Sequence, residues 1–139
     1  MIAYFETSAL LKFVFHEEGR PVARDLWDRA EAVVTSQLTY VEARAAMAAA
    51  HRSGRLTAPA HRRGVDEVDQ RWEQLAAVDL DSELTADAGT LAHVHALTGA
   101  DAVHLASAVA LRTEDLVFVS WDGRLAAGAL AAGLPVAPG

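Results

Sequence analysis

The fold is decided by residues 2–11, which read IAYFETSALL. The first four are apolar and partly aromatic, as in a short buried strand. The Thr7-Ser8 pair that follows can cap a helix that continues through Leu10 and Leu11 to about Phe15. A strand therefore runs directly into a helix, which is the order found in parallel sheets.

The same alternation continues along the chain. We find no internal repeat and no linker, so we predict a single domain over residues 1–139. An alternation of short strands and helices favours an α/β fold with a mostly parallel sheet that is covered by helices on both faces. Apolar runs predict further strands at 32–35, 76–80, 116–120 and 133–136. Helical spacing predicts helices at 21–30, 36–52, 59–75, 101–111 and 122–132. A further helix is predicted to follow a cap at Ser82 and to end where Gly99 breaks it.

Composition limits the kind of protein. With 139 residues, 52% apolar and 22% charged, the chain is long enough for one buried core and reads as soluble and globular. It lacks the roughly 20 consecutive apolar residues of a membrane span and the start of a signal peptide, so we expect a cytoplasmic protein. The absence of cysteine excludes disulfides, thiolate catalysis and cysteine-bound zinc.

Charge is distributed unevenly. A net charge of −7 argues against general electrostatic attraction to nucleic acid. The segment 43–65 nevertheless contains no Asp or Glu. Two interpretations stay open for it, a solvated helical hairpin tip or a surface that meets phosphates or an acidic partner. Its arginines are Arg44, Arg52, Arg55, Arg62 and Arg63.

Four acidic residues stand at the boundaries between elements. Glu6 follows the first strand, and Asp122 lies just past the strand at 116–120. Glu42 falls in the first two turns of its helix, and Asp101 opens another. Because ligands of such sheets bind at the carboxyl ends of the strands, all four are predicted to face one site.

Each acid also has a purely structural interpretation. Asp101 and Asp122 fit as first-turn or capping residues, Glu42 completes a Thr39-x-x-Glu capping box, and Glu6 fits as a solvated strand end. Four converging carboxylates, however, repel one another unless a cation or a proton holds them together. Oxygen donors alone favour Mg²⁺ or Mn²⁺, which can activate water against a phosphoryl group.

Several other side chains belong to the predicted site or its surroundings. Ser8 is either an accessory hydroxyl or a plain helix cap. Lys12, Arg44 and Arg124 are predicted to contact substrate phosphates, with exposed surface charge as the alternative. His104, one turn after Asp101, is predicted to be a buried, hydrogen-bonded histidine rather than a metal ligand.

Four motifs together resemble a known family. They read YFETSALLK at 4–12, TYVEAR at 39–44, DAVHLA at 101–106 and VSWDGRL at 119–125. In this order they are similar to the motifs of PIN-domain ribonucleases, in particular the VapC type of bacterial toxin. The resemblance spans nearly the whole chain.

The resemblance implies a three-layer α/β/α sandwich, Mg²⁺- or Mn²⁺-dependent endonucleolytic cleavage of RNA, a homodimer, and a cognate antitoxin that covers the active site. The family's acids fall on Glu6, Glu42, Asp101 and Asp122, with Ser8 as the accessory hydroxyl. One position departs from the family, because the first acid is normally aspartate and is Glu6 here. A longer arm leaves three outcomes: a shifted working site, a weakened enzyme, or an inactive module that still binds antitoxin or RNA.

Two other classes with an acidic Mg²⁺ pocket fit less well. A receiver domain of a signalling pathway needs a lysine after its last strand, whereas Lys12 is the only lysine in the chain. A phosphatase of the haloacid-dehalogenase kind needs two aspartates flanking one residue after the first strand, where this chain has Glu6-Thr7-Ser8.

Overall fold

The computed structural model describes residues 1–111 and 113–139. Its strands form a five-stranded sheet in the order β3-β2-β1-β4-β5, and every neighbouring pair is parallel. In chain order the elements are β1 (Ile2–Phe5), α1 (Thr7–Leu10), the 3₁₀ helix η1 (Leu11–Phe13), α2 (Arg20–Arg29), β2 (Ala32–Ser36), α3 (Gln37–Arg52), α4 (Ala58–Trp72), β3 (Ala76–Val78), α5 (Ser82–His95), α6 (Gly99–Ala110), β4 (Leu116–Val119), α7 (Gly123–Ala131) and β5 (Val136–Ala137).

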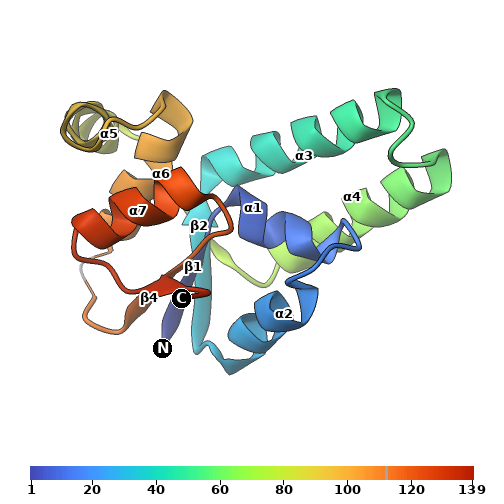
Figure 1. Ribbon diagram of the computed structural model, residues 1–139, viewed down its shortest axis with the longest axis horizontal. Helices are drawn as coiled ribbons and strands as arrows, with labels where there is room; N and C mark the ends of the chain where they lie inside the picture. Colours follow the sequence, from blue (N-terminus) through green and yellow to red (C-terminus); the bar gives the residue numbers. More distant parts are fainter. Residues whose placement is uncertain (112) are drawn as a thin grey trace.

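Helices cover both faces of the sheet, so the predicted three-layer α/β/α architecture is confirmed (Figure 1). Successive residues of a strand point to opposite faces, and β1 follows this rule with fully buried side chains on both. Ala3 and Phe5 pack with α1 to α4, whereas Tyr4 packs with α5 to α7. The central strand therefore contributes to two cores.

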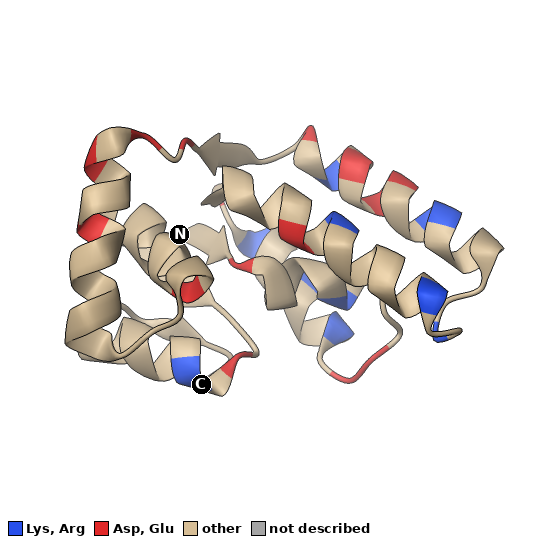
Figure 2. Cartoon of the chain, turned by 90° about the horizontal axis from the view of Figure 1, so that it is seen from above, with Lys and Arg blue, Asp and Glu red and all other residues tan. Residues whose placement is uncertain are grey.

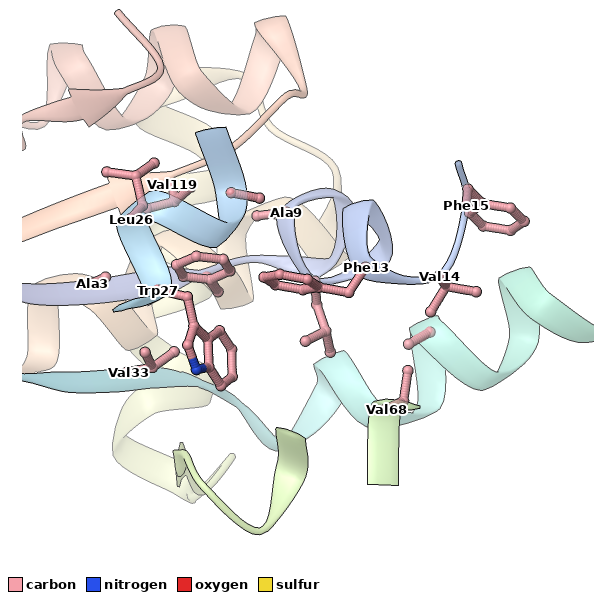
Figure 3. Close-up of a cluster of buried hydrophobic side chains, with 14 of the residues drawn as sticks. Ala3, Ala9, Phe13, Val14, Phe15, Leu26, Trp27, Val33, Val68 and Val119 are labelled. Carbon is pink, nitrogen blue, oxygen red and sulfur yellow. The ribbon is translucent and has the colours of Figure 1, made fainter. Parts of the chain in front are cut away.

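Aromatic rings fill the core beneath α1 and α2 (Figure 3). The ring of Trp27 lies edge-on to Phe5 and Phe13, with centroids 5.3 and 5.5 Å apart. The guanidinium of Arg71 stacks 3.4 Å from the centre of the Phe13 ring and binds Glu67 at 2.8 Å. This packing holds α4 against η1 and α2.

Several predicted helix ends were wrong. Glu6, not Thr7 or Ser8, is the N-cap of the first helix, which passes into the 3₁₀ turn η1 instead of continuing to Phe15. Asp81, not Ser82, caps α5. Gly99 begins α6 rather than breaking the preceding helix, which ends at His95.

Helices α3 and α4 form a hairpin that extends away from the sheet (Figure 1). Figure 2 shows Lys and Arg segments along α3 and toward the tip of this hairpin. Arg55, in the connecting turn, forms an ion pair with Glu17 and lies 4.4 Å from the centre of the Phe15 ring. Among the described residues, no helix is both long and apolar enough to cross a membrane.

Candidate active site

The four predicted acids all lie at the carboxyl edge of the sheet. Glu6 directly follows β1, and Asp122 lies three residues after the end of β4. Glu42 projects from α3, which follows β2, and Asp101 lies in the first turn of α6. Figure 1 shows the starts of α1, α3 and α7 at this edge.

Glu6 is buried, with a side chain that is only 4% exposed. Its carboxylate accepts hydrogen bonds from the backbone N–H of Ala9, at 3.2 Å, and from the hydroxyl of Ser8. Burial raises the pKa of Glu6, and the Ser8 hydrogen bond opposes that rise. The interpretation of Glu6 as a solvated strand end is therefore wrong.

Glu42 is held by two neighbours from other elements. Its Oε1 accepts from the hydroxyl of Thr7 at 2.7 Å and lies 2.6 Å from Nε2 of His104. Burial alone would raise the pKa of Glu42, but these hydrogen bonds outweigh it and the pKa is lowered. The capping-box interpretation is wrong, because Ser36 caps α3 by accepting from the N–H of Leu38.

Asp122 and Asp101 occupy the first turns of two helices. Asp122 is the N-cap of α7 and accepts from the N–H of Leu125 at 3.0 Å. Asp101 lies in the first turn of α6, which Thr98 caps. Burial and the negative charge of Asp122, with a further contribution from Glu42, raise the pKa of Asp101. The charges of Asp122 and Glu42, which come from two other elements, therefore act on Asp101.

His104 is buried and hydrogen-bonded, as predicted, with 1% of its surface exposed. Its Nδ1 lies 3.0 Å from the hydroxyl of Tyr4, and its Nε2 contacts both Glu42 and Thr7. Sequence reasoning missed that this histidine touches one of the candidate acids. The signal was its position one turn after Asp101, on the same face of the helix.

Ser8 and Trp121 connect the loop after β4 to the first helix. The backbone N–H of Trp121 donates to Oγ of Ser8 at 2.9 Å, while the hydroxyl of Ser8 donates to Glu6. The ammonium of Lys12 lies 5.3 Å from the centre of a ring of the Trp121 indole. The same indole packs against Gly19. The loop that carries Asp122 is therefore fixed from two sides.

The three predicted substrate contacts lie in different surroundings. Lys12 is mostly buried, and its Nζ is 3.1 Å from Oε2 of Glu17. Arg44 is exposed and donates to the hydroxyl of Tyr40 at 2.9 Å. Arg124 is exposed in the first turn of α7, two residues after the Asp122 cap.

The donor chemistry fits a hard cation, although the side chains are not gathered around one. Within 1–111 and 113–139, no group of three or more histidines and acids is placed to hold a metal ion. The carboxylate of Glu6 is turned to Ser8 and Ala9, and that of Glu42 to Thr7 and His104. Oxygen donors and mutual repulsion at Asp101 are nevertheless the features that a divalent cation relieves.

Comparison with known proteins identifies the class. The model of the PIN domain family matches residues 3–129, and the chain belongs to that family. Within it the chain belongs to the VapC group: it is 45% identical over 141 residues to Ribonucleases VapC45 and VapC49 of Mycobacterium tuberculosis, a match that covers 99% of this chain and 95% of theirs.

Solved structures share the fold. VapC20 of Mycobacterium tuberculosis, described as a toxin that cleaves the sarcin-ricin loop, aligns with a TM-score of 0.69 at 18% identity over 95% of both chains. A chain of a toxin-antitoxin complex from Klebsiella pneumoniae aligns with a TM-score of 0.62 at 18% identity over 86% of both.

Proposed function

We propose that this protein is a metal-dependent endoribonuclease and the toxin of a toxin-antitoxin pair. The observation that carries the proposal is the position of four acids from separate elements at the carboxyl edge of one sheet, where the charges of Asp122 and Glu42 also raise the pKa of Asp101. The family adds support, because its relatives at 45% identity are named ribonucleases.

The acids would hold Mg²⁺ or Mn²⁺. Asp101, Asp122 and Glu42 offer carboxylate oxygens at one edge of the sheet, and Glu6 offers another behind the Ser8 hydroxyl. When bound, such a cation lowers the pKa of water and neutralises charge that develops on a phosphoryl oxygen.

The remaining site residues would bind and orient the RNA. Ser8 donates its hydroxyl hydrogen to the carboxyl group of Glu6. Its oxygen accepts from the N–H of Trp121, which fixes the loop before Asp122. Lys12, Arg44 and Arg124 would meet phosphates beside the acids. These cations, together with the metal, would let a chain of net charge −7 bind a polyanion.

The proposed partners are an antitoxin and a second copy of the chain. A Klebsiella pneumoniae protein with this fold was solved as a toxin-antitoxin complex, which supports an antitoxin partner here. Such a partner would cover the acidic edge of the sheet and exclude RNA from it. A homodimer is our expectation from the VapC group.

A second candidate function is a PIN-like module that binds antitoxin or RNA without cutting. One observation favours it: Glu6 is 4% exposed and bonded to Ser8 and Ala9, so its carboxylate serves as a helix cap. Burial also raises the pKa of Glu6, which opposes the ionised form that a metal needs.

The test uses purified, antitoxin-free protein incubated with structured RNAs in Mn²⁺, Mg²⁺ or EDTA. We expect metal-dependent cleavage by the wild type or by Glu6→Asp, and none by Asp101→Ala. Cleavage by Glu6→Asp alone would assign the second function to this chain. If neither protein cuts RNA with either metal, the nuclease proposal fails.

A further inference from the structure

The strongest unassigned feature is a buried chain of hydrogen bonds that ends on Glu42. Tyr4 from β1, Thr7 from α1 and His104 from α6 form it, and none of them is among the four acids. The hydroxyl of Tyr4 is 3.0 Å from Nδ1 of His104, and Nε2 of His104 is 2.6 Å from Oε1 of Glu42. Tyr4 and His104 are almost completely buried, whereas the side chain of Glu42 is 30% exposed.

The positions of the hydrogens follow from what each atom can donate. An ionised carboxylate only accepts, so Nε2 of His104 carries a hydrogen and donates it to Glu42. The hydroxyl of Tyr4 lies 3.0 Å from Nδ1 of His104, so the second ring nitrogen also has a hydrogen-bond partner. Thr7 donates to the same Oε1 of Glu42, and its oxygen, 3.2 Å from Nε2, can accept a second branch of the histidine N–H.

We infer that His104, which donates from Nε2 and is held at Nδ1 by Tyr4, is a positioning residue that orients the carboxylate of Glu42 for metal binding. Both hydrogen bonds described for this carboxylate go to Oε1, which leaves Oε2 available to a ligand. This inference rests on the proposed function, and it adds a residue that the four-acid site does not contain.

Orientation is useful at this position because glutamate is flexible. A partly exposed glutamate on a helix has three side-chain torsions, and ordering them at the moment of binding opposes association. A hydrogen bond from a rigid, buried imidazole orders the carboxylate beforehand. Residues that hold metal-binding side chains in this way typically change metal affinity by about 10- to 100-fold when they are replaced.

The variants separate positioning from packing. His104→Leu fills the space but removes the donor, whereas His104→Gln keeps an N–H at similar reach to Glu42. Tyr4→Phe removes the hydroxyl that bonds Nδ1 of His104. Leu105→Val is the matched control, because Leu105 is the fully buried neighbour of His104 on the same helix and does not bond Glu42.

The first measurement needs no metal. The ¹⁵N–¹H correlation spectrum of the imidazole in metal-free protein should show a hydrogen on Nε2 of His104 that exchanges faster with water in Glu42→Ala. The absence of a hydrogen on Nε2, or unchanged exchange in Glu42→Ala, overturns the inference.

The second measurement is Mn²⁺ affinity by calorimetry, at a temperature where all variants are folded. We expect roughly tenfold weaker binding for His104→Leu, a smaller loss for Tyr4→Phe, and affinities within about threefold of wild type for His104→Gln and Leu105→Val. If the wild type binds Mn²⁺ and His104→Leu binds it equally well, the inference fails and the metal site stands. If the wild type binds no Mn²⁺, the proposed function fails, and the role of His104 in metal binding fails with it.

Discussion

Replacement of Gly19 by alanine should loosen the loop that carries Asp122. Gly19 is the N-cap of α2 and has a φ of +97°, in the left-handed region that side chains rarely adopt. A Cβ at this position would lie 2.8 Å from Nε1 of Trp121 and 3.0 Å from two carbons of its ring. The indole must shift, and its backbone N–H is bonded to Ser8.

Two contributions set the magnitude. The left-handed backbone costs an alanine about 1 kcal/mol relative to glycine. Overpacking against a rigid, half-buried ring adds about 1–3 kcal/mol. We therefore expect Gly19→Ala to lose about 2–4 kcal/mol of unfolding free energy in total.

Gly54 provides a matched control. It has a φ of +81°, but a Cβ there would have no atom within 4 Å. Gly54→Ala should therefore lose only the backbone contribution, about 1 kcal/mol. The assay is urea unfolding of both variants, followed by RNA cleavage under conditions where both are folded, in which we expect Gly19→Ala alone to be impaired. Equal stability of the two variants would refute the idea that Trp121 is held against Gly19.

Three further predictions concern the acids and the hairpin. Burial raises the pKa of Glu6 in the folded state above its usual value of 4.5. Protonated Glu6 therefore stabilises the fold fully below pH 4.5, and this stabilisation is lost as the pH rises through the folded-state pKa. Glu6→Gln should thus be more stable than wild type by about 1–3 kcal/mol at pH 7.5 but not at pH 4, as measured by urea unfolding; no gain at pH 7.5 would contradict this. Asp122→Ser keeps a capping oxygen, so its free energy of unfolding should stay within about 0.5 kcal/mol of wild type. Its rate of RNA cleavage should fall on the order of 100-fold or more. Retained cleavage would show that Asp122 does not belong to the site. Arg55 and Arg63 line a cavity of about 580 Å³ at the hairpin, whereas Arg52 and Arg62 do not. When the first pair is changed to glutamine, fluorescence titration of metal-free protein with RNA should show a weaker affinity and a salt slope lower by about 1–2, and the second pair should have a smaller effect. Equal effects of the two pairs would favour the solvated-surface interpretation.

The elements of the fold were predictable because their signals are local. Apolar runs of strand length alternate with helical spacing, and each neighbouring strand pair is parallel, as this alternation requires. The caps were harder, since Glu6 is not among the side chains that usually cap helices, and the Thr7-Ser8 pair beside it is. The N–H of Glu6 still bonds to the carbonyl of Val119 in β4, and α1 begins at the next residue, so Glu6 occupies the cap position.

The contacts inside the site could not be predicted from local patterns in the sequence. Thr7 meets Glu42 across 35 residues of sequence, and Tyr4 meets His104 across 100. No pattern within one helix or strand encodes such a pairing, because it depends on the crossing of elements from both halves of the chain. The position of the acids at element ends was predictable, whereas the partners that hold each acid were not.

Those partners make the four acids unequal as metal ligands. Asp122 caps a helix with one oxygen, and Glu42 is held through Oε1, so each has a second oxygen to offer. Glu6 also accepts through Oε1, from Ser8 and Ala9, but it is buried, and burial raises its pKa and favours its neutral form. Metal binding there must supply the energy to ionise the group. Aspartate ionises at a lower pH than glutamate, so we expect Glu6→Asp to bind the metal more tightly than the wild type.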